Sequence, residues 1–196
     1  GIMVRGTMEW SLDEATLERL FQEHACDQYT REVTISALVG LLIQVSAGLR
    51  ASTHAAYKAD RATDNPTIPT SYQALYGKLG RMQPAFGEAL VRHSAEKLGA
   101  LLHMLPAATD NLLPGYRLRV LDGNVLTGTD HRLGALRKWL NACLPGKSLV
   151  VYEPALGLVT DLVLCEDAYT QERALLVHVV DRLKAADLVV ADRNFC

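Results

Sequence analysis

Two segments of the chain share one pattern, and together they constrain the fold more than any other feature. The segments are Arg117–Asn124 and Asp187–Asn194. In each, an apolar run of strand length leads to an aspartate, Asp122 or Asp192, and an asparagine follows two residues later. If the two runs are neighbouring parallel strands, both carboxylates emerge at the same edge of one sheet, where open α/β sheets bind ligands.

The predicted order of elements can bring the two runs together. Tyr116–Leu121 is expected to be the first strand, Ser148–Tyr152 and Leu158–Cys165 a hairpin, Thr170–Ala185 a helix and Asp187–Ala191 the last strand. Short links favour antiparallel pairing of the first three strands. The helix then supplies the right-handed crossover that places the last strand parallel to the first.

The chain changes character near residue 110. Residues 9–110 are predicted to be helical, because apolar residues recur at helical spacing and Ser11 with Glu14 fits a capping box. Residues 1–8 show no periodicity and are expected to be a cloning remnant or disordered. Residues 111–196 are predicted to form a mixed sheet. The predicted class is therefore α+β or α/β, an all-helical N-terminal region followed by strand-strand-strand-helix-strand.

Composition gives limited guidance about partners. The 196 residues are 49% apolar and 21% charged, with a formal net charge of −2, so the chain is globular in type and has no global basic signature of nucleic-acid binding. Locally, Gly115–Lys147 holds six basic residues against two acidic ones, and Arg50–Arg81 holds five against two. Either cluster fits a phosphate-facing surface or an ordinary solvated face.

Cysteines and hydropathy bear on the compartment. The four cysteines are scattered without a C-x-x-C pair, which favours reduced thiols in the cytoplasm over a disulfide framework or a zinc site. The longest apolar stretch, Ile35–Leu49, contains polar residues and is too short to span a bilayer. We therefore expect no membrane partner.

The two aspartates together predict a divalent-metal site. Carboxylates held a few ångströms apart repel each other unless a cation lies between them. Mg²⁺ prefers carboxylate and phosphate oxygens, and two such ions can support an in-line displacement at phosphorus. The alternative is that each aspartate caps a turn at a strand end. The repeated placement of Asp122 and Asp192 favours the metal site.

Val120–Asn124 and Val189–Phe195, with the strand order between them, resemble the RNase H-like core of DDE transposases, in particular the bacterial insertion-sequence-four group. The resemblance implies that Asp122 and Asp192 are catalytic and hold two Mg²⁺ (or Mn²⁺) ions. It implies DNA as the partner, both transposon ends and target, and a homodimer in the synaptic complex. It also implies a cytoplasmic, nucleoid-associated bacterial protein, with residues 9–110 as a possible DNA-binding region.

In that family a third acid, a glutamate, follows in a Tyr-x-x-Arg-x-x-x-Glu motif. The sequence stops at Cys196, before such a motif, so residues 111–196 are expected to be the first half of an RNase H-like catalytic domain. The chain as given is expected to be truncated and inactive as a transposase. Glu172 is a possible substitute, since RNases H place an acid there, or it simply favours a helix N-terminus. The resemblance also makes His131 and Arg132 candidate DNA-binding residues.

Two other functions stay open. One is a non-catalytic DNA-binding or inhibitory transposase fragment that pairs with the full-length enzyme. The other is an unrelated α/β domain whose strand-end aspartates bind a small phosphorylated ligand. The sequence has no glycine-rich phosphate loop of either common type, which counts against the second.

Overall fold

The computed structural model describes residues 2–25, 33–105, 112–126, 146–165 and 167–195. These residues form a mixed α and β structure in two compact units, Gly1–Leu90 and Val91–Cys196. The division lies within α6 (Pro84–His103), earlier than the predicted change of character near residue 110. Across the described ranges, no helix combines the length and the apolar composition needed to cross a membrane.

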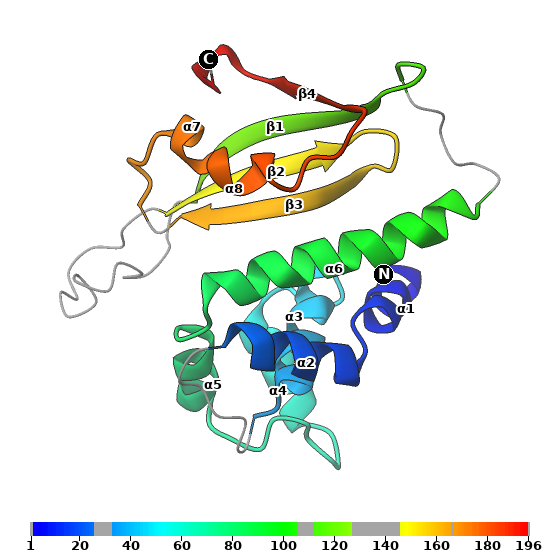
Figure 1. Cartoon of the computed structure of the whole chain (residues 1–196). Coiled ribbons are helices and arrows are strands. Elements are labelled where there is room, and N and C mark those ends of the chain that lie inside the picture. The colour runs from blue at the N-terminus through cyan, green and yellow to red at the C-terminus, as the bar shows by residue number, and fades with distance from the viewer. Residues whose placement is uncertain (1, 26–32, 106–111, 127–145, 166, 196) are drawn as a thin grey trace. The chain divides into compact units, whose positions relative to one another are not determined.

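The first unit is helical, as predicted. Its elements are α1 (Ile2–Ser11), α2 (Glu14–His24), α3 (Ile35–Ser46), α4 (Thr53–Arg61), α5 (Tyr72–Leu79) and the beginning of α6 (Figure 1). The core is built from apolar side chains of these helices and from Ile68, which is fully buried in the loop before α5. Phe21 and Phe86 meet edge to face at its centre, with ring centroids 5.7 Å apart.

The first helices begin at other residues than predicted. Residues 2–8 belong to α1, so the expectation of a disordered terminus is wrong. The Ser11 hydroxyl donates back to the Met8 carbonyl at 2.9 Å and closes α1. Asp13 caps α2 instead, by accepting a hydrogen bond from the Thr16 N–H at 3.0 Å. The predicted capping box at Ser11 is therefore wrong, although a helix does begin beside it.

The second unit is a four-stranded mixed sheet with short helices. Its strands are β1 (Arg117–Leu126), β2 (Gly146–Glu153), β3 (Leu158–Cys165) and β4 (Asp187–Ala191), in the spatial order β3-β2-β1-β4 (Figure 1). β1–β2 and β2–β3 pair antiparallel, whereas β1–β4 pair parallel. The predicted pairing of the first and last strands is thus confirmed.

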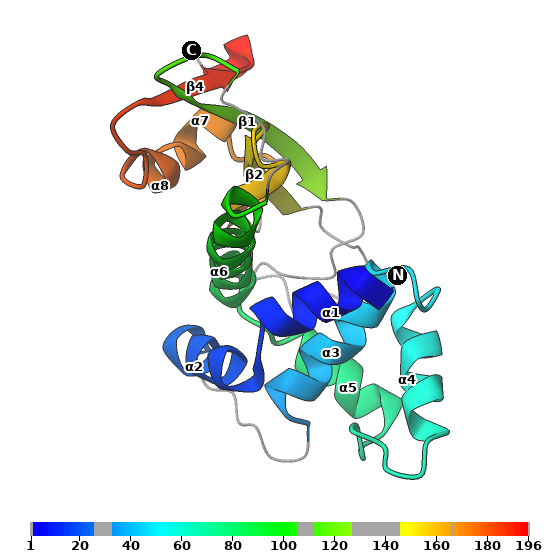
Figure 2. The ribbon, with the colours of Figure 1, turned by 90° about the vertical axis from the view of Figure 1, so that its right-hand side faces the viewer.

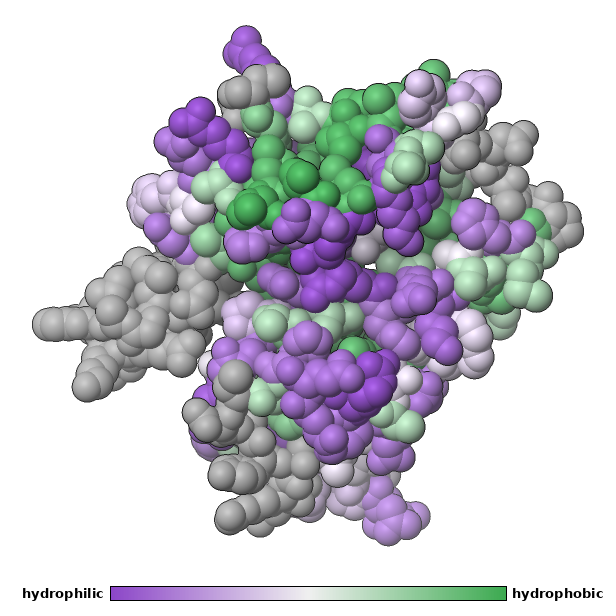
Figure 3. Space-filling model, viewed as in Figure 1, coloured by the Kyte–Doolittle hydropathy of each residue, from purple (hydrophilic) through white to green (hydrophobic). Residues whose placement is uncertain are grey.

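Two short helices cover one face of this sheet, in place of the single helix predicted over Thr170–Ala185. They are α7 (Glu172–Leu175) and α8 (Val177–Val180), and both lie on the same side of the strands (Figure 2). The core between sheet and helices contains Leu121, Leu149, Val151, Val163, Leu175 and Val179. Figure 3 shows apolar side chains gathered over α8, where Val177 and Val180 are exposed.

An ion pair fixes the start of the parallel pairing. Arg117 and Asp187 are partners in the β1–β4 register, and the guanidinium donates to both carboxylate oxygens, at 2.6 and 2.9 Å. The Lys184 N–H also donates to this carboxylate, at 2.9 Å. Burial raises the pKa of Asp187, but these hydrogen bonds and the nearby arginine charges outweigh burial, so its pKa lies below the ordinary value.

Replacement of Asp187 by asparagine is expected to cost about 3 kcal/mol at pH 7, because it breaks a buried pair and leaves Arg117 without its counter-charge. Because the folded-state pKa is lowered, the wild-type stabilisation is present above about pH 4 and is lost as the pH falls through the folded-state value. Urea unfolding from pH 7 to pH 2 measures both effects. The matched variant is Asp181→Asn, since Asp181 is exposed. Equal unfolding midpoints for the two variants at pH 7 would contradict the role of the pair.

Candidate functional site

The parallel pairing of β1 with β4 brings the two predicted metal ligands to neighbouring positions. The pairs run in register up to Leu121↔Ala191, so Asp122 and Asp192 directly follow the last pair. Paired strands lie about 4.8 Å apart, and both aspartates are exposed. The register therefore brings Asp122 and Asp192 to neighbouring positions of adjacent chain segments, and both residues are exposed.

Asp122 lies inside β1 rather than at its end, which corrects the sequence-based prediction. β1 continues to pair with β2 as far as Leu126↔Gly146. Because side chains alternate along a strand, Asp122 lies on the face opposite the buried Leu121, and Asn124 shares the face of Asp122. The backbone at Asp122 is thus held by the ladder to β2 after the pairing with β4 has ended.

A short helix after β4 fixes the position of Asp192. This helix, η2 (Arg193–Phe195), begins at the next residue, and the Phe195 N–H donates to the Asp192 carbonyl at 3.0 Å. Phe195 in turn packs against the apolar core of the second unit. A partly buried ring therefore anchors the turn that carries Asp192.

Glu172 approaches the same part of β1 from the helix-covered face. Its carboxyl group lies directly over Gly123, where an added Cβ would come within 2.3 Å of Oε1. Lys147 of β2 lies beside it, with 3.7 Å between Nζ and Oε1. The same Nζ donates to the Thr170 carbonyl at 2.9 Å. The charge of Glu172 is thus balanced by a mostly buried lysine.

Glu172 does not join the two aspartates in one ligand set. Within the described ranges, no three His, Cys, Asp or Glu side chains are grouped so that they could hold a metal ion. The donors at this edge are therefore Asp122 and Asp192. Two carboxylates suit Mg²⁺, which usually keeps several waters and binds one or two protein carboxylates together with substrate phosphates.

The structure adds Gly123 and Lys147 to the residues that the sequence singled out. A glycine inside a strand often marks the close approach of another group, so the sequence carried a signal for Gly123. It carried none for Lys147, whose contact with Glu172 depends on the position of β2. His131 and Arg132, the candidate DNA-binding residues, lie outside the described residues.

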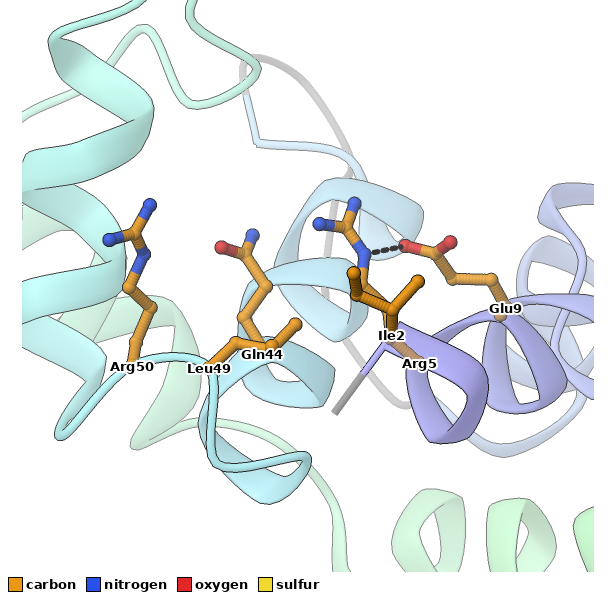
Figure 4. A pocket seen from close by; sticks show the side chains of 7 residues that line it. Ile2, Arg5, Glu9, Gln44, Leu49 and Arg50 are labelled. Atoms are coloured by element: carbon orange, nitrogen blue, oxygen red, sulfur yellow. Dashed lines mark hydrogen bonds and ion pairs between the residues drawn. The ribbon is translucent and has the colours of Figure 1, made fainter.

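Two other cavities are lined by charged groups. In the first unit, a groove of about 460 Å³ runs between α1 and the end of α3, and there Arg5 and Glu9 form an ion pair at 2.7 Å (Figure 4). In the second unit, a cleft of about 540 Å³ contains Asp161, which pairs with Arg92 at 3.4 Å and Arg182 at 2.6 Å. Acidic and basic side chains thus form ion pairs with one another in both cavities.

In comparisons with known proteins, the chain matches no family model, no curated protein and no solved structure. A proposal about its function therefore rests on its own residues. We call the part of the sheet at Asp122 and Asp192 the aspartate edge. It combines two exposed aspartates with backbone that is held by the pairing of β1 with β2 and β4, and the Lys147–Glu172 ion pair lies on the opposite face of β1.

Replacement of Gly123 by alanine is expected to displace the Glu172 carboxyl group, because the new Cβ would lie 2.2 Å from its Cδ. The displaced group is the flexible end of a side chain, so we expect a cost of about 1 kcal/mol, at the low end for overpacking. Urea unfolding measures this cost. A double-mutant cycle with Glu172→Ala isolates the contact, since alanine at position 123 should not destabilise that background. The same cost in both backgrounds would rule the contact out.

Proposed function

We propose that the chain carries the first two acids of a DDE transposase, on an RNase H-like sheet, and acts on the phosphodiesters of DNA. The observation that carries the proposal is the register of β1 and β4, after which Asp122 and Asp192 follow as neighbours. The order β3-β2-β1-β4, with its one parallel pair, agrees with the strand order that such a sheet requires. The sequence motifs around both aspartates supply the rest of the support.

Mg²⁺ or Mn²⁺ is the cofactor that this donor set fits, with Asp122 and Asp192 as the residues that would hold it. When bound, such ions activate a water or hydroxyl nucleophile and stabilise the leaving oxygen of an in-line displacement. Both carboxylates are exposed, so water and the phosphate oxygens of a substrate can reach them from solvent.

The remaining residues of the site set the position and the charge of the two ligands. The ladder to β2 holds the backbone of Asp122, and the turn anchored by Phe195 holds Asp192. Lys147 balances the charge of Glu172 on the face of β1 opposite Asp122. Asp122 and Asp192 are therefore the acids that would hold the ion, and Glu172 is not grouped with them.

A non-catalytic DNA-binding or inhibitory role is the second candidate, and one observation favours it. Among the described residues, no third acid is grouped with Asp122 and Asp192. Two acids suffice to bind an ion and a phosphate, whereas the resemblance implies three for strand cleavage. The two candidates therefore share metal and DNA binding and differ in whether the DNA is cut.

Asp122→Asn and Asp192→Asn are each expected to weaken Mn²⁺ binding by more than about tenfold. The loss of a residue that only hydrogen-bonds to a metal ligand already lowers metal affinity by about tenfold or more, and the loss of a ligand itself should lower it further. Isothermal titration calorimetry of the whole chain measures the affinity. Asp181→Asn is the matched control, since Asp181 is an exposed aspartate on a different element. Mn²⁺ binding that neither ligand variant weakens would contradict the assignment of the site.

Transposon-end DNA incubated with Mn²⁺ and the chain separates the two candidates. Strand cleavage that the Asp122→Asn variant lacks supports the catalytic role. Salt-dependent DNA binding without cleavage supports the non-catalytic role. Cleavage at an undiminished rate by the Asp122→Asn variant would contradict both.

A further inference from the structure

Four aromatic side chains of α4 and α5 lie in contact on the first unit. His54 meets Tyr72 edge to face, with ring centroids 4.5 Å apart. Tyr72 also lies 4.5 Å from Tyr76 and 5.4 Å from Tyr57. Tyr72 is half-buried, whereas His54 is exposed and Tyr76 is 44% exposed. Two solvent-facing rings, one from each helix, are thus supported by a common ring between them.

The rings are held in place by hydrogen bonds that use their polar ends. The Tyr57 hydroxyl donates to the Thr70 carbonyl at 2.8 Å and ties α4 to the start of α5. A side-chain hydrogen bond with Tyr76 raises the pKa of Tyr72 to about 12. Like the phenol of an ordinary tyrosine, the Tyr72 phenol is neutral at physiological pH and puts no negative charge on this surface.

Cations line the same face of α4. His54, Tyr57, Lys58 and Arg61 follow the spacing i, i+3, i+4 and i+7, so they form one stripe on the helix. Lys58 and Arg61 are exposed, and Arg61 Nη1 donates to the Pro69 carbonyl at 3.4 Å. The stripe therefore carries positive charge directly beside the aromatic rings.

One of the two acids near this face, Asp60, is engaged by the loop before α5. Asp60 accepts hydrogen bonds from the Thr67 N–H at 3.0 Å, the Thr67 hydroxyl at 2.6 Å and the Ile68 N–H at 3.0 Å. Its carboxylate is thus used to hold the loop before α5. Lys78, by contrast, does not add to the basic surface that the sequence suggested, because it is buried and donates to the Val33 carbonyl.

We propose that the α4–α5 aromatic surface, defined by His54, Tyr57, Lys58, Arg61, Tyr72 and Tyr76, binds single-stranded nucleic acid. Figure 2 shows the two helices that carry these residues. Bases stack on the exposed rings of Tyr76 and His54, and the phosphate backbone follows the cations of α4. Lys58 and Arg61 are the exposed cations that phosphate can reach. The oxygens of Asp60 accept hydrogen bonds from the loop, and the second acid of this segment, Asp64, lies in that loop after the end of α4.

The geometry favours a single strand over a duplex. The faces of duplex bases are stacked on one another and cannot reach a ring on a protein surface, whereas those of a single strand can. Every base has a stacking face, so binding should tolerate changes of sequence. The surface lies in the first unit and uses no metal, so it is independent of the proposed function at the aspartate edge.

Tyr76→Ala is expected to weaken binding of a fluorescein-labelled dT15 oligonucleotide by at least about fivefold, the lower limit for loss of one stacking ring. Tyr76→Phe keeps the ring and should bind within about twofold of wild type. Lys58→Ala should weaken binding and make it less dependent on salt. Fluorescence anisotropy of the whole chain in EDTA measures the affinity, with circular dichroism confirming that each variant folds.

Tyr169→Ala and Lys97→Ala are the matched controls, since both side chains are exposed and lie in the second unit. Neither should change the affinity. DNA and RNA oligonucleotides of the same length determine which sugar is preferred, and binding of either supports the proposal. A wild-type chain that binds neither oligonucleotide, or that binds duplex more tightly than single strands, would overturn it, as would full affinity in Tyr76→Ala.

The same assay keeps this proposal distinct from the proposed function. An Asp122→Asn, Asp192→Asn double variant should bind the oligonucleotide like wild type in EDTA. Loss of oligonucleotide binding in Tyr76→Ala with Mn²⁺ affinity unchanged supports the α4–α5 surface alone. Oligonucleotide binding that depends on the two aspartates instead would assign it to the second unit and contradict the proposal.

Discussion

The parallel pairing of β1 with β4 is the interaction on which the second unit and its site depend. The two strands are joined in register although Arg117 and Asp187, the first pair, are 70 residues apart in sequence. Bringing together two residues so far apart in the chain costs conformational entropy. The hydrogen bonds of the ladder, the Arg117–Asp187 ion pair at its start and the packing of Phe195 against the core offset that cost. A shift of one residue in register would move the two exposed aspartates to opposite faces of the sheet.

The sequence predicted the strands and their pairing well, because apolar runs of strand length and short links constrain a sheet strongly. It predicted the end of β1 poorly. Asp122, Gly123 and Asn124 are unfavourable in strands, so the run seemed to stop at Leu121. Pairing with β2 overrides that local preference and carries the strand on to Leu126. Local propensity gives no information on a partner strand that comes 20 residues or more later in the chain.

Two other differences also have physical causes beyond local pattern. The single helix predicted over Thr170–Ala185 is divided into α7 and α8. Val179 is buried in the core, so packing decides its place rather than helical periodicity. The number of basic residues in Arg50–Arg81 overstates the exposed positive charge for a similar reason. Lys78 is one of the five, and its ammonium group is buried and donates to the Val33 carbonyl.

One aspartate begins β4 and another directly follows its last residue, and the two have different surroundings. Asp187 is almost fully buried, and its two oxygens already accept hydrogen bonds from Arg117 and Lys184. A cation could reach that carboxylate only by breaking a buried ion pair, at a cost of several kcal/mol. Asp192 directly follows the last pair of the strand and is exposed, so a cation bound there need not break the buried Arg117–Asp187 pair. The same side chain therefore stabilises the sheet where it is buried against an arginine, and it is accessible to solvent where the strand ends.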